Sequence, residues 1–384
     1  MNELTTKTQT TFKNIFETEA SHVIRAPGRV NLIGEHTDYN DGFVFPAALN
    51  FATVIAARKR DDAIVKVVSL DYGNEIDEFD TTKKITHSEK PWANYVRGTV
   101  KTLIDNGFEV GGAELAISGD VPQGAGLSSS ASLEVAVGYT FKTLFTLEVT
   151  NKKIALMGQE AENKFVGCNC GIMDQLISAC GVKGKALLID CRTLDCEPCE
   201  VPADLSIVII NSNMKRELVG SEYNTRRESC EEAAAFFGVK ALRDVSIAQL
   251  EEKLNALPDV IGRRARHIVT ENQRTLDMGK ALNQKDYAHI SRLMAGSHAS
   301  MKDDFEITIP EIDFLVNTGA ELLGEKGGIR MTGGGFGGCV VALVPNEMVD
   351  TFTNVVCKKY VEKTKITATV YVCKASAGVE VIQG

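Results

Sequence analysis

The chain has 384 residues, too many for one ordinary hydrophobic core, and this length fits two domains. Its 44% apolar and 24% charged residues describe a soluble globular protein. The net charge of −9 disfavours nucleic acid and anionic membranes as main partners. Residues 1–7 lack the apolar segment of a signal peptide, and no apolar run approaches the roughly 18 residues of a membrane span. We therefore expect a cytoplasmic protein without nucleic-acid or membrane partners, and we take it to be a monomer.

The ten cysteines indicate reduced thiols, because no secretory signal accompanies them. Cys196 and Cys199 form a C-x-x-C pattern, and Cys168 and Cys170 lie upstream. This arrangement leaves a zinc or redox site open. However, no matching histidine pair or second C-x-x-C follows, so plain reduced cysteines are the favoured interpretation.

In chain order, the first elements are an amphipathic helix over residues 3–18 and a short strand over residues 22–26, which ends at Pro27 and Gly28. A polar loop over residues 28–42 follows, in which Glu35, His36, Asp38 and Tyr39 fall within five positions. A solvated loop explains this polarity. A sugar site explains it equally well, because carboxylates and imidazole bind neighbouring hydroxyls through hydrogen bonds.

Residues 43–70 alternate as strands, over 53–57 and 64–70, and residues 71–74 turn the chain. Ser69 ends the second of these strands. Trp92, the only tryptophan, fits a core or helix-start position better than a ring stacked on a nucleobase. A strand over residues 114–118, with the character of an edge strand, leads to a glycine- and serine-rich loop.

That loop spans residues 122–132, and an apolar helical pattern follows it to residue 145. Gly124 and Gly126 allow a tight turn and a close backbone approach to a ligand. A glycine loop that leads into a helix start presents free N–H groups to phosphate, and serine hydroxyls can bind Mg²⁺ or phosphate. A plain turn with a helix cap remains the alternative. No Gly-Lys-Ser/Thr follows, so this is not a P-loop.

A second helical stretch over residues 154–165 carries Glu162, and a short segment with Asp174 comes after it. Helical glutamates are usually solvated, so Glu162 by itself is a weak metal-ligand candidate. Asp174 is more informative because its neighbours at 172, 173, 176 and 177 are apolar. An aspartate in such surroundings must be paired or functional.

The second half of the chain begins with a break in regular structure near residues 190–203 and a buried strand over 205–211. A charged stretch over 215–228 fits a basic helix face. The glycine-rich segment 327–338 leads directly into a strand over 339–344, which indicates an ordered loop. His298 is not favoured as a catalytic group. The remaining expected elements are helices over 230–237, 247–254, 261–282, 287–305 and 312–323, and strands over 367–373 and 378–382.

Three motifs resemble one family of small-molecule kinases. The loop at 122–131 is similar to the second motif of the GHMP kinases, and the glycine-rich segment at 327–338 is similar to their third. Residues 28–42, G-R-V-N-L-I-G-E-H-T-D-Y-N-D-G, resemble the signature that separates galactokinases from other GHMP kinases. The similarity extends through essentially the whole chain.

The resemblance implies an α+β fold with two domains. Residues 1–200 would form a ribosomal-protein-S5-like mixed α/β domain, and residues 201–384 a ferredoxin-like domain whose last strand is free to return to the first. The active site would lie in the cleft between them. The implied reaction is phosphorylation of galactose by ATP, with Mg²⁺, to galactose 1-phosphate and ADP.

The resemblance also implies roles for individual residues. Asp174 would take the proton of the anomeric hydroxyl or only orient that hydroxyl, and Arg29 would pair with Asp174. Ser130 and Glu162 would hold Mg²⁺. The sugar contacts would be Glu35, His36, Thr37, Asp38, Asp174 and Tyr223. The nucleotide contacts would be Ser69, Gly124, Ala125, Gly126, Leu127, Ser128, Ser129 and Ser130.

Two alternatives remain. A kinase for a related sugar such as N-acetylgalactosamine would share most of these motifs. A regulator that binds galactose and ATP without catalysis is disfavoured, because relatives of that kind lack residues of the serine loop, whereas Ser130 and Ala131 are present here together with Arg29 and Asp174.

Overall fold

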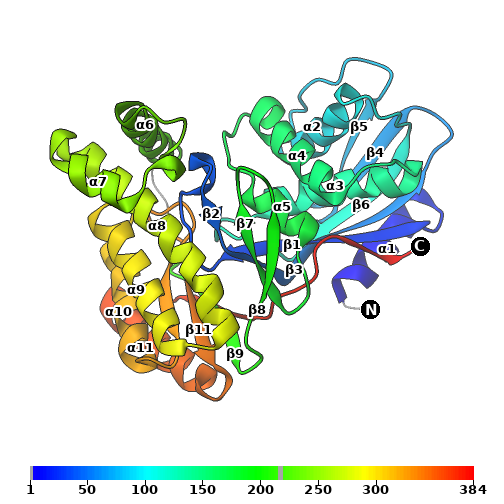
Figure 1. Cartoon of the computed structure of the whole chain (residues 1–384). Helices are drawn as coiled ribbons and strands as arrows, with labels where there is room; N and C mark the ends of the chain where they lie inside the picture. Colours follow the sequence, from blue (N-terminus) through cyan, green and yellow to red (C-terminus); the bar gives the residue numbers. More distant parts are fainter. Residues whose placement is uncertain (1–2, 215–218) are drawn as a thin grey trace.

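The computed structural model describes residues 3–214 and 219–384. The chain forms an N-terminal part around a six-stranded sheet and a C-terminal part around a four-stranded sheet, with a small three-stranded sheet near their junction (Figure 1). Both ends of the chain lie on the N-terminal part (Figure 1). Within the described residues, no helix combines the length and the apolar character needed to cross a membrane.

The six-stranded sheet is mixed, because β4 and β6 run parallel while its other neighbours are antiparallel. In spatial order its strands are β13 (Glu380–Gln383), β1 (His22–Asn31), β3 (Pro46–Lys59), β6 (Ala113–Gly119), β4 (Ile64–Ser69) and β5 (Glu75–Asp80). The last strand of the chain thus pairs with the first.

Two predictions about these strands are wrong. The first strand does not end at Pro27 but runs on to Asn31, and its pairing with β3 shifts register between Pro27 and Arg29. A bulge of this kind accommodates a proline, which has no N–H to donate. The strand over 114–118 is not an edge strand. It corresponds to β6, which lies between β3 and β4, and its residues on both faces of the sheet are buried.

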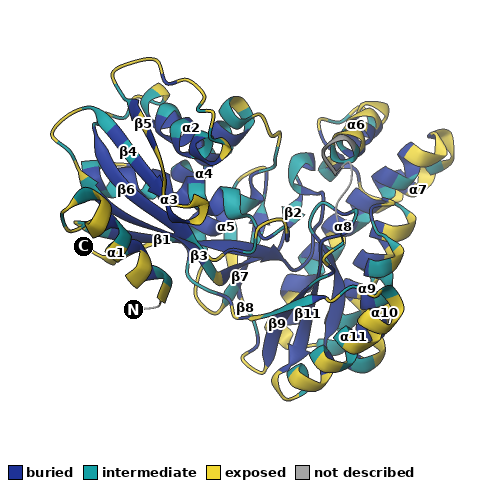
Figure 2. Cartoon of the chain, turned by 180° about the vertical axis from the view of Figure 1, so that it is seen from behind, coloured by how far each residue is buried: buried dark blue, intermediate teal, exposed yellow. Residues whose placement is uncertain are grey.

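Helices cover both faces of this sheet, and its inner strands form a largely buried layer between them, whereas the edge strands β5 and β13 are largely exposed (Figure 2). Helix α1 (Glu3–Phe16) packs Phe12 against Val54, Ala56 and Ala116. The larger core lies on the other face. The helices of that face are α2 (Pro91–Asp105), α3 (Ser129–Phe145), α4 (Asn151–Ala161) and α5 (Met173–Cys180). Helix α3 is largely buried, as its apolar pattern predicted.

One strand of the three-stranded sheet, β8 (Cys196–Glu200), lies in the region 190–203 that we expected to be irregular. The sheet consists of β2 (Phe43–Val44), β7 (Lys185–Asp190) and β8. The prediction failed because Pro198 suggested a break, whereas β8 is an edge strand that tolerates a proline opposite Leu187. The C-x-x-C thiols of Cys196 and Cys199 are free and lie within this strand.

The C-terminal part is an antiparallel sheet covered by helices. Its strands in spatial order are β10 (Gly328–Thr332), β11 (Cys339–Pro345), β9 (Leu205–Asn211) and β12 (Thr369–Cys373). Its helices are α6 (Val219–Phe237), α7 (Ile247–Lys253), α8 (Asp259–Gln284), α9 (Tyr287–Asp303), α10 (Pro310–Leu323) and α11 (Val349–Thr364). Short 3-10 turns occur at Asp38–Asn40, Leu70–Tyr72, Leu242–Asp244, Leu254–Ala256 and Asn346–Met348. Of the charged stretch 215–228, residues 215–218 lie outside the described residues.

Candidate active site

The loop between β6 and α3 has the tight geometry that its glycines predicted. Gly124 and Gly126 have φ angles of 70° and 74°, and Ser128 also adopts the left-handed region with φ 61°. Helix α3 then begins at Ser129, and Ser128 makes no capping bond to it. Its hydroxyl instead donates to Asp174 Oδ2. The loop is therefore more than a helix cap, since it brings a helix N-terminus, suited to phosphate, next to a carboxylate.

Asp174 lies in the first turn of α5 and forms a two-pronged ion pair with Arg29 of β1. Arg29 Nε and Nη2 each lie 2.8 Å from one carboxylate oxygen. Arg29 Nη1 also donates to the carbonyl oxygen of Gly126 at 2.5 Å. The apolar neighbours of Asp174 required a partner for its charge, and Arg29 is that partner. The same guanidinium fastens the serine loop to the carboxylate.

Glu35 is buried, and the C-terminal part fixes its position. Its Oε1 lies 3.0 Å from Arg330 Nη2, and it accepts hydrogen bonds from Thr332 Oγ1 at 3.0 Å and Gly333 N at 2.9 Å. Arg330 is itself fully buried. Because these donors come from β10 and the glycine-rich segment, the polar loop and that segment are held together at the junction of the two parts.

His36 is neutral in the folded protein. Burial, together with the charges of His267 and Arg226, lowers the pKa of His36 to about 3. Its Nδ1 lies 2.8 Å from Tyr39 Oη, and its ring centroid lies 5.1 Å from that of Tyr223 on α6. The imidazole therefore acts as a hydrogen-bonding group rather than as a charge.

Asp38 lies close to the segment that carries Asp174. Burial, and to a smaller extent the charge of Asp174, raises the pKa of Asp38 from 3.8 to about 6. A Cβ atom on Gly171 would lie 1.8 Å from Asp38 Oδ2, so only glycine at this position admits the carboxylate. Thr37 differs from its neighbours, because its buried hydroxyl contacts the carbonyl oxygens of Gly34 and Phe43 at 3.0 Å and 2.6 Å and holds the loop.

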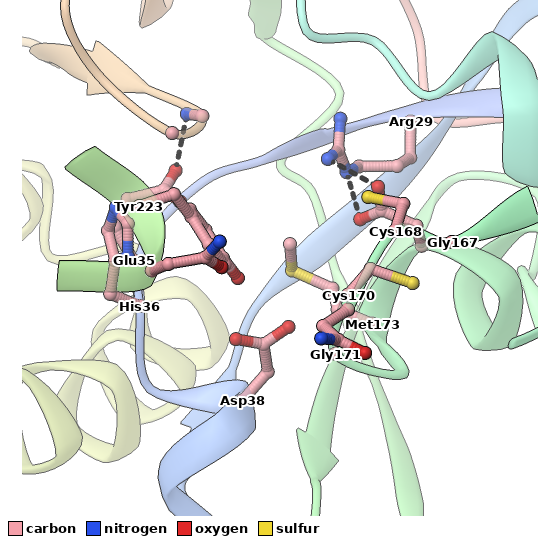
Figure 3. A pocket seen from close by; sticks show the side chains of 15 residues that line it. Arg29, Glu35, His36, Asp38, Gly167, Cys168, Cys170, Gly171, Met173 and Tyr223 are labelled. Atoms are coloured by element: carbon pink, nitrogen blue, oxygen red, sulfur yellow. Dashed lines mark hydrogen bonds and ion pairs between the residues drawn. The ribbon is translucent and has the colours of Figure 1, made fainter. Parts of the chain in front are cut away.

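These side chains surround a cavity of about 450 Å³. His36, Glu35 and Tyr223 lie together on one side of it, Arg29 lies on another, and Asp38 points in between them (Figure 3). Of the predicted sugar contacts only Thr37 does not line it. The lining residues are Arg29, Glu35, His36, Asp38, Gly167, Cys168, Asn169, Cys170, Gly171, Met173, Asp174, Tyr223, Asn224, Gly333 and Gly334.

Sequence reasoning did not anticipate all of this lining. The sequence drew attention to Cys168 and Cys170 only as thiols, and it did not single out Asn169 or Asn224. Their positions in the sequence could have indicated them, because residues 168–170 directly precede the Asp174 segment and Asn224 directly follows Tyr223. His298 lines neither this cavity nor the next one and is buried beside Asp313, with 3.3 Å between Nε2 and Oδ1.

A second cavity of about 390 Å³ lies against the serine loop. Ser69, Gly124, Ser129 and Ser130 line it, whereas Ala125 and Leu127 are buried in the core. The remaining lining residues are Thr53, Asp71, Tyr72, Pro91, Trp92, Tyr95, Ile117, Gly119, Val121, Gln123 and Leu133. The loop thus connects the two cavities, because Ser128 contacts Asp174, which lines the first, and Ser129 and Ser130 line the second.

The position of Trp92 fits both interpretations of its role, that of a core residue at a helix start and that of a ring beside a nucleobase. Trp92 is 6% exposed, stands at the start of α2 and donates from Nε1 to Glu75 Oε2 at 2.9 Å. It also lines the second cavity, where Tyr72 lies nearly parallel to it with 6.2 Å between the ring centroids. A core position and a position beside a flat ligand are therefore compatible here.

Glu162 lies in an irregular helical turn, and its side chain is buried. It begins a π-helical turn, Glu162–Val166, at the end of α4, a feature found often at functional sites. Burial raises the pKa of Glu162, and so does the charge of Asp174, while hydrogen bonds from Cys170 and Ser130 oppose that shift. A hydroxyl and a carboxylate oxygen are hard ligands, and Mg²⁺ is commonly bound by one or two carboxylates plus substrate phosphates. Ser130 and Glu162 therefore fit a magnesium site beside the second cavity.

Comparisons with known proteins agree with this architecture. Residues 94–182 match the GHMP kinases N terminal domain and residues 278–362 match the GHMP kinases C terminal model. The fold is also that of a Methanococcus jannaschii mevalonate kinase, with a TM-score of 0.63 and 19% identity over 93% of this chain and 99% of that one. A Streptococcus pneumoniae phosphomevalonate kinase has a TM-score of 0.65 at 13% identity, over 94% and 99% of the two chains. Fold and site thus define a GHMP kinase, and the α+β prediction is confirmed.

Two further matches are more specific. Residues 10–59 match the galactokinase galactose-binding signature. The crystal structure of Lactococcus lactis galactokinase complexed with galactose is 37% identical, has a TM-score of 0.92, and the similarity covers 98% of this chain and 99% of that one. The chain belongs to the galactokinase family.

Proposed function

We infer that the protein transfers the γ-phosphoryl group of ATP to the anomeric hydroxyl of galactose, giving galactose 1-phosphate and ADP. The observation that carries this inference is the position of Asp174. It lines the polar cavity and contacts Ser128 of the loop, whose residues Gly124, Ser129 and Ser130 line the second cavity. A sugar in the first cavity and a triphosphate in the second would meet at this carboxylate.

We propose that the first cavity binds galactose. Glu35 and Asp38 supply acceptors for sugar hydroxyls, neutral His36 supplies a donor or an acceptor, and Tyr223 contributes from α6. Thr37 supports the loop through the hydroxyl contacts described above. The domain boundary near residue 200 and the monomeric state stay predictions.

We propose that Asp174 accepts the proton of the anomeric hydroxyl, and that Arg29 compensates its charge and the charge that develops on the transferred group. Phosphoryl transfer depends mainly on positioning and charge stabilisation. The ion pair serves both, because Arg29 connects the carboxylate with the loop carbonyl of Gly126. The hydrogen bond from the Ser128 hydroxyl further restricts the orientation of the Asp174 carboxylate.

A panel of free sugars tests the proposal directly. With ATP and Mg²⁺, galactose should give ADP and a sugar 1-phosphate that ³¹P NMR identifies. N-acetylgalactosamine and glucose should react much more slowly. Faster turnover of N-acetylgalactosamine would favour the related kinase, and binding of galactose without any ADP formation would favour a regulator.

Mg²⁺, when bound with ATP, supplies positive charge to the phosphate oxygens, and we propose that Ser130 and Glu162 hold it. Glu162→Gln is expected to raise the Mg²⁺ concentration needed for half-maximal activity far more than it changes the KM for galactose. Glu160→Gln is the matched control, because Glu160 lies on the same helix but forms an ion pair with Lys164 at 2.6 Å. Equal effects on Mg²⁺ and galactose, or none on Mg²⁺, would contradict the metal assignment.

The kcat/KM for galactose is expected to fall as the pH drops through about 6. The pKa of Asp38 is raised to about 6, so its carboxylate is lost at a higher pH than that of an ordinary aspartate. A protonated carboxyl group has less capacity to accept from sugar hydroxyls. His36 cannot cause the change because its pKa is lowered to about 3. Asp38→Asn should remove this step from the pH profile, and an unchanged profile in that variant would assign the step to another group.

A further inference from the structure

Glu134 is a buried carboxylate that the proposed mechanism does not yet use. It lies on α3 one turn after Ser130, so the two side chains share a face of the helix. Glu134 is 0% exposed and its neighbours on α3 are apolar. Such a group is costly to bury unless it is partnered, and its partner indicates its role.

That partner is Gln175, the residue after Asp174 on α5. Gln175 Nε2 donates to Glu134 Oε2 at 3.0 Å and to Glu162 Oε2 at 2.7 Å. One amide group thus bridges two buried carboxylates with both of its N–H bonds. Helix α4 makes room for the bridge at Gly158, where a Cβ atom would lie 3.3 Å from Gln175 Cγ and 3.4 Å from the Glu134 Cβ.

The cluster has no lysine or arginine partner among the described residues, and two of its acceptor oxygens are unpartnered. Besides Gln175, Glu162 Oε2 accepts a hydrogen bond from Cys170 Sγ at 3.2 Å. Glu134 Oε1 and Gln175 Oε1 are buried without a hydrogen-bond partner in the part of the chain that the structure describes. Buried acceptors in native proteins are normally satisfied, and exceptions point to an ion, a water or a catalytic role.

We propose that Gln175 and Glu134 are positioning residues for the magnesium site: Glu134 anchors the Gln175 amide, and the amide holds the Glu162 carboxylate where it faces Ser130. This inference rests on the magnesium role of Glu162 proposed above. Groups that orient a metal ligand in this way typically contribute 10–100-fold to metal affinity or activity. The bridge also joins the glycine–serine motif of α3 to the Asp174 segment, because Gln175 follows Asp174 directly.

Mn²⁺ affinity in the presence of ADP, measured by electron paramagnetic resonance on the full chain, tests the proposal without a turnover assay. Gln175→Met keeps the length of the side chain and removes the amide. It should weaken Mn²⁺ binding roughly 10–100-fold while the Kd for galactose, measured by calorimetry, stays near that of the wild type. Thr140→Val is the control, since it removes a buried hydroxyl bond on α3, from Thr140 Oγ1 to Ala136 O at 2.8 Å, away from the bridge.

Glu134 offers a test by conservative rescue. Glu134→Gln keeps an oxygen that can accept from Gln175, so its Mn²⁺ affinity should stay close to that of the wild type. Glu134→Met removes the acceptor and should weaken Mn²⁺ binding as Gln175→Met does. A merely structural role would instead lower the melting temperature of the variants without separating Mn²⁺ from galactose binding. If Gln175→Met fails to fold, the Glu134 pair alone decides.

Glu162→Gln distinguishes failure of this inference from failure of the function on which it rests. If Glu162→Gln weakens Mn²⁺ binding while Gln175→Met and Glu134→Met do not, the positioning role is wrong and the metal assignment stands. If Glu162→Gln binds Mn²⁺ as the wild type does, both are wrong.

Discussion

Asp174→Asn is expected to lower kcat for galactose by at least about 100-fold, the lower end of the contribution of a general base. Asparagine keeps the shape of the side chain but removes both the proton acceptor and the negative charge that Arg29 and Ser128 contact. ATP and galactose should still bind, because the two cavities keep their other lining groups. Steady-state kinetics together with calorimetry of both ligands would measure this separation of kcat from binding.

The chain contains a closely matched control for this substitution. Asp77 forms a two-pronged ion pair with Arg97, at 2.7 Å and 3.0 Å, and accepts from Ser88 Oγ at 2.8 Å. Asp77→Asn therefore makes the same chemical change in a similar environment, away from both cavities. It should lower stability and leave kcat nearly unchanged. Near-normal turnover by Asp174→Asn would make Asp174 a structural residue and leave the chemistry to the loop and the metal.

Arg29→Ala should lower kcat as well, and it should also destabilise the fold. The substitution leaves the Asp174 carboxylate without its guanidinium and frees the Gly126 carbonyl oxygen. Removing one partner of a buried pair is costly because the other charge stays behind. Its melting temperature should therefore be measured beside its kinetics.

Deoxygalactoses are expected to be very poor substrates wherever the missing hydroxyl is one that the polar loop contacts. A site built to hydrogen-bond a hydroxyl rejects an analogue without it by up to about 10⁴–10⁵ in kcat/KM. Glu35 and Asp38 are such groups, since both are held in place by the fold, Glu35 by Arg330 and Asp38 beside Gly171. Comparing kcat/KM across the full set of deoxy analogues measures the discrimination at each position.

Asp38→Ala should flatten this discrimination at the hydroxyl that Asp38 contacts and leave it intact elsewhere. Asp41→Asn is a suitable control in the same loop, because Asp41 pairs with Arg192 at 3.2 Å outside the cavity. Asparagine is chosen there because Asp41 has φ 56°, a region that asparagine tolerates. If every deoxy analogue reacts as well as galactose, the loop does not bind the sugar.

Some sequence predictions failed because they depended on partners far along the chain. The strand β5 was not anticipated, because its sequence does not alternate apolar and polar residues and its buried face carries Asp77 beside Phe79. The buried charge of Asp77 is tolerated because Arg97 of α2 pairs with it. The central position of β6 was missed because a short apolar run looks the same at an edge and in the middle of a sheet.

The sequence by itself determined the local features of the site. The left-handed turns at Gly124 and Gly126, the start of α3 and the need of Asp174 for a partner all follow from backbone sterics and the cost of burying a charge. The motifs also determined the family, because they are long and contiguous.

Only the tertiary structure decided which groups meet. Arg29 and Asp174 are 145 residues apart, and Glu35 is held by Arg330 and Gly333 from the other part of the chain. The tertiary structure also decided that Thr37 faces the loop rather than the cavity and that Gln175 bridges Glu134 and Glu162. Side-chain direction at such positions depends on the packing of distant elements against one another, which no local pattern specifies.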